Sequence, residues 1–99
     1  MIRQDKSFYI VRGEKSGVFF GEIAERTGSE VTMKNVRRLW QWRGAASISQ
    51  LAKSGTTMPH NCKFTVVVDE VIILDAIEID KCTKEAVKSI QGVDEWKMQ

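Results

Sequence analysis

Arginine and tryptophan side chains are concentrated in residues 36–53, which read Val-Arg-Arg-Leu-Trp-Gln-Trp-Arg-Gly-Ala-Ala-Ser-Ile-Ser-Gln-Leu-Ala-Lys. This segment holds two of the three tryptophans and three of the six arginines of the chain. A guanidinium group donates two parallel hydrogen bonds to a phosphate, and an indole ring offers a flat face on which a base can stack. The segment is therefore the strongest candidate for a binding surface.

The geometry of an extended chain sorts these side chains onto two faces. Because alternate residues of a strand point to the same side, Arg38, Trp40 and Trp42 are expected to share one face, with Arg37 on the other. The same residues could instead be structural, with the tryptophans as core anchors and the arginines along a sheet edge. At least one of the two tryptophans is expected in the core, because a domain of this size needs such bulk.

A helix is predicted over residues 44–54, from apolar residues at helical spacing and a glycine at its end. Its start would offer free backbone N–H groups and a partial positive charge to an anion that the strand also contacts. The predicted ligand-binding residues are Arg38, Trp40, Trp42, Arg43 and Ser47.

The charge distribution also favours an anion-attracting face. Residues 1–60 carry ten Lys/Arg against five Asp/Glu, whereas residues 61–99 carry five against eight. No acidic residue occurs between Val31 and Val68, a window of 38 residues that contains six basic ones. The alternative is an ordinary solvated surface whose compensating acids come from elsewhere in the fold.

Candidate metal ligands and nucleophiles are few. His60, Cys62 and Cys82 lack the paired spacing of structural zinc sites. His60 and Cys62 are too close in sequence for the usual catalytic pair, whose members come from different elements. We therefore expect neither a metal site nor a cofactor.

Acidic pairs and loop motifs do not indicate an enzyme either. The pairs Asp69/Glu70 and Glu78/Asp80 are expected to lie on solvated surface, in a turn and on the outer face of a strand. No glycine-rich phosphate loop and no nucleophile elbow is present. The sequence thus favours a non-enzymatic protein with no catalytic residues.

Length and composition indicate one cytoplasmic domain spanning residues 1–99. The chain is 42% hydrophobic and 28% charged, with a net charge of +2. The longest apolar runs, 66–68 and 71–74, are far too short to span a membrane, and the N-terminus lacks a hydrophobic signal core. The two cysteines are accordingly expected to be reduced.

The pattern of the whole chain predicts an α+β fold. Strands are expected at 7–12, 18–25 and from 30 to 42, with a bulge near 34–35 and a bulge or close backbone contact at Gly21. Two further strands, 63–68 and 71–80, would be joined by a turn at 69–70, with residues 66–68 buried on both faces. A helix over 84–91, capped by Thr83, would precede a return strand with Trp96 buried. The predicted architecture is a curved antiparallel sheet or small open barrel of five to six strands with two short helices.

Three segments also carry a resemblance: Arg-Arg-Leu-Trp-Gln-Trp-Arg-Gly-Ala-Ala-Ser-Ile-Ser-Gln-Leu-Ala, Pro-His-Asn-Cys-Lys-Phe at 59–64, and Ile-Glu-Ile-Asp-Lys-Cys-Thr at 77–83. From about residue 17 to 97 the chain resembles small uncharacterised proteins encoded by tailed phages and prophages. The resemblance implies no activity. It implies an accessory protein of the host bacterial cytoplasm, a kind of protein that often acts by binding.

The functional expectation is therefore a non-enzymatic, phage-type accessory protein that binds a phosphate-bearing ligand, a nucleotide or single-stranded nucleic acid. The alternative is a protein–protein interaction module, for example an inhibitor of a host bacterial factor, in which the same tryptophans and arginines would be hot spots. A structural or assembly role without a ligand is a third reading. Homo-oligomers are compatible with each of them.

Overall fold

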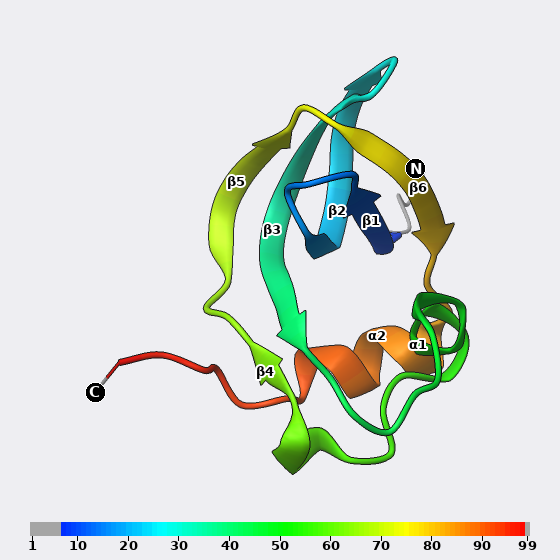
Figure 1. The fold of residues 1–99 in the computed structure, drawn as a ribbon, viewed down its shortest axis with the longest axis vertical. Coiled ribbons are helices and arrows are strands. Elements are labelled where there is room, and N and C mark those ends of the chain that lie inside the picture. The colour runs from blue at the N-terminus through cyan, green and yellow to red at the C-terminus, as the bar shows by residue number, and fades with distance from the viewer. Residues whose placement is uncertain (1–6, 99) are drawn as a thin grey trace, which may run out of the picture.

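The computed structural model describes residues 7–98. Six strands, two α-helices and one 3₁₀ turn follow one another (Figure 1): β1 (Tyr9–Gly13), β2 (Val18–Thr27), β3 (Glu30–Gln41), α1 (Ile48–Ser54), η1 (Pro59–Asn61), β4 (Lys63–Phe64), β5 (Val68–Ile73), β6 (Ala76–Lys81) and α2 (Lys84–Gln91).

The strands form one antiparallel sheet in the order β4-β3-β2-β1-β6, with β5 also paired to β3. Strand β3 is long enough to hold both β4 and β5 along one edge, at Leu39↔Phe64 and from Val31↔Ile73 to Val36↔Val68. Strands β5 and β6 are consecutive, yet they pair with opposite edges of the β1–β2–β3 meander. The sheet must therefore curl, and within residues 7–98 it stays open between β5 and β6. The predicted α+β fold with a curved antiparallel sheet is confirmed.

The β5–β6 connection holds the curled sheet together through Asp75. Its carboxylate accepts hydrogen bonds from the backbone N–H of Lys15 (2.8 Å) and Ser16 (3.2 Å) and from the Ser16 hydroxyl (2.6 Å). Its carbonyl accepts from the Glu14 N–H at 2.9 Å. These bonds fix the β1–β2 turn against β5. The Ser16 hydroxyl and then the Lys15 N–H hold the pKa of Asp75 below its ordinary value of 3.8.

Asp75→Asn is expected to lower the melting temperature near neutral pH, because an amide cannot accept all three bonds. A carboxylate with a lowered folded-state pKa stabilises the fold above its ordinary value of 3.8 and loses that contribution as pH falls through the folded-state pKa. The difference between wild type and variant should therefore be constant near neutrality and shrink in acid. Thermal unfolding from neutral pH to about pH 2 measures this. A melting-temperature difference that stays the same at every pH would contradict this prediction. Asp69→Asn, at an exposed carboxylate, is the control.

The bulge predicted in the third strand is present. Between the pairs Phe20↔Arg37 and Glu22↔Lys34, β3 contains one residue more than β2, and Asn35 takes a positive φ of 49°. The close approach predicted at Gly21 is also present: a Cβ there would lie 2.9 Å from both the Lys34 carbonyl oxygen and the Val36 Cα. The bulge re-phases β3, so that Val36 points into the core again.

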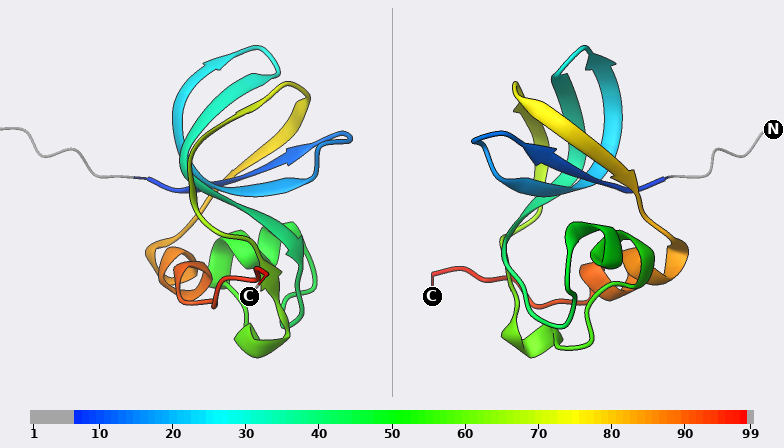
Figure 2. Two further views of the ribbon diagram at one scale, coloured as in Figure 1. Left: turned by 90° about the vertical axis from the view of Figure 1, so that its left-hand side faces the viewer. Right: turned by 45° about the vertical axis from the view of Figure 1, so that its right-hand side comes forward.

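Two apolar clusters lie on opposite faces of the sheet. Helices α1 and α2 pack side by side below the strands (Figure 2), and they enclose the larger cluster, which comprises Ile10, Phe20, Leu39, Leu51, Ala52, Phe64, Cys82, Ala86, Ile90 and Val93. The inside of the curved sheet holds the smaller cluster, which comprises Val11, Phe19, Val31, Met33, Val36 and Ile73. Neighbouring strand residues such as Ile10 and Val11, or Phe19 and Phe20, therefore belong to different clusters.

The terminal helix has the predicted bounds, whereas the first helix is shorter than predicted. The Thr83 hydroxyl accepts from the Ala86 N–H (3.0 Å), and α2 ends at Gly92. Helix α1 was predicted to begin at Gly44, but it begins at Ile48. Gly44 has a left-handed φ of 83°, and its Cα lies close to the 56–58 loop, so a helix cannot start there.

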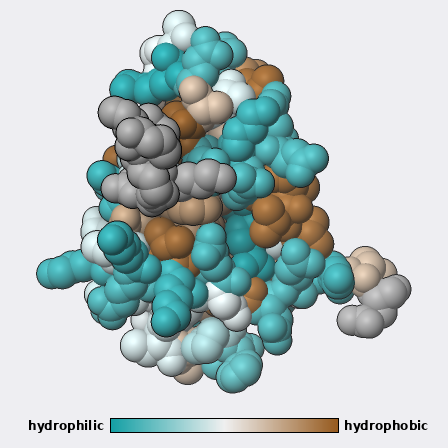
Figure 3. Space-filling model, turned by 180° about the vertical axis from the view of Figure 1, so that it is seen from behind, coloured by the Kyte–Doolittle hydropathy of each residue, from teal (hydrophilic) through white to brown (hydrophobic). Residues whose placement is uncertain are grey.

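The turn predicted at Asp69-Glu70 is wrong. Both residues lie within β5, opposite β3, and the chain reverses at residues 74–75 instead. The run 66–68 is not buried on both faces but exposed, with Val67 50% accessible. Val66 and Val67 lie between β4 and β5, and Val68 begins β5. Figure 3 shows an apolar area on this side of the molecule.

Trp96 is not buried, contrary to the prediction. The segment after α2 makes an isolated bridge between Glu95 and Phe64 rather than a strand, and the Trp96 ring remains 45% exposed. The large stability loss expected for a fully buried indole therefore does not apply to this residue.

Candidate ligand-binding surface

The structure brings three of the five predicted binding residues together. Arg38, Trp40 and Trp42 line one shallow depression of about 260 Å³, beside the β1–β2 turn. The remaining lining comes from Lys15, Ser16, Gly17, Val18 and Leu39. The alternation of side chains along β3 puts Arg38 and Trp40 on one face, as predicted. Trp42 lies beyond the end of β3 and packs against the larger cluster, so the shared face predicted for it is wrong, although it borders the same depression.

Arg38 sits at the edge of this depression with part of its guanidinium group unused. Nη1 donates to the Ser16 carbonyl, and the guanidinium carbon lies 4.4 Å from the centroid of the Phe19 ring. Within residues 7–98, Nε and Nη2 donate no hydrogen bond, and no carboxylate lies within ion-pair distance. The contact with Phe19 fixes the plane of the group, so its free N–H groups have a defined direction.

Trp40 is the most exposed aromatic side chain of the surface, at 61%. Its ring stacks on Trp96, with centroids 6.1 Å apart and an interplanar angle of 24°. The Lys63 ammonium lies 5.3 Å from the centroid of the Trp96 ring. Trp42 is only partly exposed and packs against the larger apolar cluster. One tryptophan is thus largely a core residue, as expected, and the other is free to contact a ligand.

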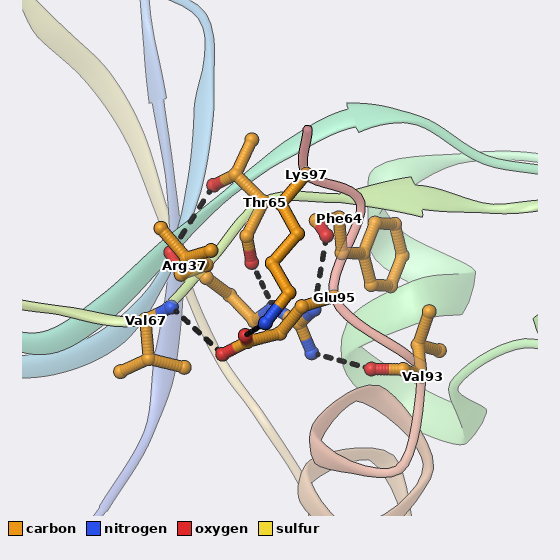
Figure 4. Close-up of polar contacts among 8 residues, drawn as sticks. Arg37, Phe64, Thr65, Val67, Val93, Glu95 and Lys97 are labelled. Carbon is orange, nitrogen blue, oxygen red and sulfur yellow. Dashed lines mark hydrogen bonds and ion pairs between the residues drawn. The ribbon is translucent and has the colours of Figure 1, made fainter. Parts of the chain in front are cut away.

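Arg37 lies on the opposite face of β3, as predicted, and is only 3% exposed. Figure 4 shows its guanidinium among backbone carbonyls: Nε donates to Thr65 (2.9 Å), Nη1 to Ile90 and Val93 (both 3.0 Å), and Nη2 to Phe64 (3.0 Å). Burial lowers the pKa of Arg37, and the charge of Glu95 opposes this. Arg37 joins β4, α2 and the C-terminal segment, and it is not available to a ligand.

Arg43 and Ser47 do not line the depression. The Arg43 side chain is exposed, and its carbonyl accepts from the Thr56 hydroxyl at 2.5 Å. The Ser47 hydroxyl accepts from the Gln50 N–H (3.2 Å) as the N-cap of α1, and the Gln50 side chain accepts from the Ala46 N–H (2.7 Å). These local bonds occupy the helix start that the sequence suggested as an anion site.

The basic residues of the acid-free window differ in whether an acidic side chain or a carbonyl group pairs with them. Lys34 is paired with Glu70 at 2.5 Å, and Arg37 is held by carbonyls. Within residues 7–98 no acidic side chain lies within 4 Å of the cationic groups of Arg38, Arg43, Lys53 and Lys63. Compensation by acids from elsewhere in the fold, the alternative reading of this window, thus occurs at Lys34. It does not occur around the tryptophans, where positive charge remains.

Sequence reasoning missed Lys15, Ser16, Lys63 and Trp96 as neighbours of this surface. Lys15 and Ser16 belong to the turn signal Glu-Lys-Ser-Gly, and only the curl of the sheet brings that turn beside Arg38. Lys63 was visible as a basic residue of the acid-free window. Trp96 carries no local signal for its position beside Trp40.

Other side chains able to take part in chemistry are the two thiols and the carboxyl of Asp80. Cys62 and Cys82 are not bonded to each other, and burial raises the pKa of the Cys82 thiol to about 12. Burial, followed by the Glu78 carboxyl, raises the pKa of Asp80 to about 6. Asp80 is half-buried rather than fully solvated as expected. No group of three or more possible metal ligands occurs within residues 7–98.

Fold and surface together define a small α+β domain with an open curved sheet and an exposed Arg/Trp face. Residues 6–90 match the family described as a domain of unknown function (DUF6948). The match covers more than half of the 99 residues, and the protein therefore belongs to this family. No curated protein and no solved structure matches the chain. None of the helices described in residues 7–98 has the length and apolar character needed to cross a membrane.

Proposed function

We propose that this protein binds a ligand that carries both phosphate and a nucleobase, either a nucleotide or single-stranded nucleic acid. The observation that supports this most directly is an exposed indole, Trp40, lining the same depression as a guanidinium with unused N–H groups, Arg38. Stacking of a base on an aromatic side chain contributes about 1–3 kcal/mol. Phosphate recognition by arginine adds charged hydrogen bonds in a fixed plane.

Each residue of the surface has a role in this proposal. Trp40 stacks on the base, and Trp96 supports its ring from one side. Arg38 donates to a phosphate oxygen, while Lys15 and Lys63 add positive charge. The acid nearest to Lys15 is Asp75, whose carboxylate is occupied by three hydrogen bonds from the β1–β2 turn. Arg43, outside the depression, contributes only long-range attraction. Action as a phage-type accessory protein in a bacterial cytoplasm stays a prediction from the sequence.

A protein–protein interface is the second candidate, and one observation favours it. The run Val66–Val68 is exposed, and the Val67 N–H donates to Glu95, the residue before Trp96. Exposed apolar side chains together with tryptophan and arginine are typical of interaction hot spots. Against this, the basic side chains around Trp40 would have to be desolvated in an apolar interface. The nucleotide proposal uses those charges directly.

Binding of a labelled short oligonucleotide, followed by fluorescence anisotropy at low and at physiological salt, tests the proposal. Arg38→Ala is expected to weaken binding by about 1.5–3 kcal/mol, which is roughly tenfold to 150-fold. Trp40→Ala should weaken it by about 1–3 kcal/mol. Added salt should weaken wild-type binding steeply, since phosphate contacts release counterions.

Lys53→Ala is the matched control, because Lys53 is an exposed cation of α1 that does not line the depression. It should change affinity far less than Arg38→Ala. If neither mononucleotides nor oligonucleotides bind at low salt, or if Arg38→Ala binds as well as wild type, the proposal is wrong. The protein-interface candidate would then take its place.

A further inference from the structure

A second depression adjoins the one that contains Trp40. It has a volume of about 470 Å³, and it shares Lys15, Ser16 and Arg38 with the first depression. Arg38 therefore stands between two hollows, with the tryptophans on one side and strand β5 on the other. The two hollows adjoin at Arg38 beside the β1–β2 turn, and together they are called the groove.

The β5 half of this groove is apolar. Its lining includes Val71, Ile72 and Leu74, with the ring of Phe19 beneath Arg38. Ile72 alternates with Val71 and Ile73 of the smaller apolar cluster, so its side chain points to the other face of β5. Leu74, at the turn after β5, is 70% exposed, so its side chain is available to a ligand. Such a surface suits the flat face of a base rather than a charged group.

The one anionic side chain in this half is Asp75. Three hydrogen bonds from the β1–β2 turn occupy its carboxylate, and they keep it ionised. A phosphate placed beside β5 would be repelled by this charge, whereas one at Arg38 is attracted by both Arg38 and Lys15. The charges thus place phosphate in the middle of the groove and leave its two ends for uncharged parts of the ligand.

We propose that the ligand is a single-stranded nucleic acid of at least two nucleotides. Its phosphodiester linkage lies at Arg38, with one base on Trp40 and the next base on Val71 and Leu74. This inference rests on the proposed function and specifies the ligand of the same surface. A mononucleotide would occupy the tryptophan half and the phosphate position but leave the apolar β5 half in contact with water.

A length series of thymidine nucleotides tests the inference on the full chain: thymidine monophosphate, the dinucleotide dTpdT and the tetranucleotide. We expect the dinucleotide to bind at least tenfold tighter than the monophosphate and the tetranucleotide to add little per site. Leu74→Ser should weaken dinucleotide binding several-fold and leave monophosphate binding unchanged. Ile77→Ser, which removes a similarly exposed side chain of β6 outside both hollows, should change neither affinity.

The same length series distinguishes a wrong two-nucleotide groove from a wrong proposed function. Equal affinities for the monophosphate and the dinucleotide, or an equal loss of both in Leu74→Ser, would overturn the two-nucleotide groove and leave nucleotide binding intact. Absence of binding for all three probes at low salt would overturn both. Since Leu74 is largely exposed, Leu74→Ser should fold like wild type, and a thermal melt of each variant checks this.

Discussion

Replacing Arg37 with alanine is expected to destabilise the fold by about 3–5 kcal/mol. Its guanidinium donates to four carbonyls, and two of them keep another donor: Phe64 accepts from the Trp96 N–H, and Ile90 accepts from the backbone after α2. The carbonyls of Thr65 and Val93 have no other partner within residues 7–98. Each would be left unsatisfied at about 1–3 kcal/mol. The void left by the long side chain adds to this.

Urea unfolding of Arg37→Ala measures this loss, and Arg37→Lys separates charge from geometry. Lysine keeps the charge, but its single ammonium cannot reproduce the planar fork that reaches four carbonyls, so it should recover only a small part of the stability. Arg43→Ala, which removes an exposed guanidinium, should change stability by less than about 0.5 kcal/mol. A loss below about 1 kcal/mol in Arg37→Ala would show that water replaces its hydrogen bonds.

The elements that follow from local signals were predicted correctly. Helix α2 has its N-cap at Thr83 and its end at Gly92, and both act within one turn of the helix. The bulge at Asn35 was visible as a slip in the apolar alternation of the third strand. In each case the sequence signal and the structural feature lie within a few residues of each other.

Features that depend on contacts between distant segments could not be predicted from local sequence signals. Asp69 and Glu70 look like a turn, but the actual turn at residues 74–75 is stabilised by Asp75 bonds to Lys15 and Ser16, from another part of the chain. The exposure of Trp96 likewise depends on how the C-terminal segment meets β4. The predicted start of the first helix was wrong because no residue pattern around Gly44 indicates its left-handed conformation.

The candidate surface also combines features set by local sequence with features set by distant segments. The shared face of Arg38 and Trp40, and the opposite face of Arg37, follow from the period of a strand. Carbonyls accept from four of the five N–H groups of Arg37, whereas Arg38 donates only one hydrogen bond within residues 7–98. This difference is decided by β4, α2 and the β1–β2 turn. Residue type alone does not distinguish these two neighbouring arginines, although one is structural and the other is proposed to bind phosphate.

Gly21→Ala is expected to destabilise the protein by about 3 kcal/mol, the upper end of the range for overpacking a buried site. The added Cβ would lie 2.9 Å from the Lys34 carbonyl oxygen and from the Cα and Cβ of Val36. Two of these atoms belong to the backbone of β3, so a rotamer change cannot relieve the contact. The bulge at Asn35 is what brings β3 this close to β2, since it turns Val36 inward.

Gly28→Asn is the matched control for this substitution. Gly28 also lies at the β2–β3 hairpin, with a φ of 60°, but a Cβ there meets no atom within 4 Å, and asparagine tolerates this conformation. Its stability should therefore change by less than about 0.5 kcal/mol in the same urea titration. If Gly21→Ala were equally mild, β3 would be able to move away from β2 at the bulge. The Val36 side chain would then not be fixed in the core by the close contact at Gly21. The register after the bulge, which turns Arg37 rather than Arg38 toward the helices, would need another cause.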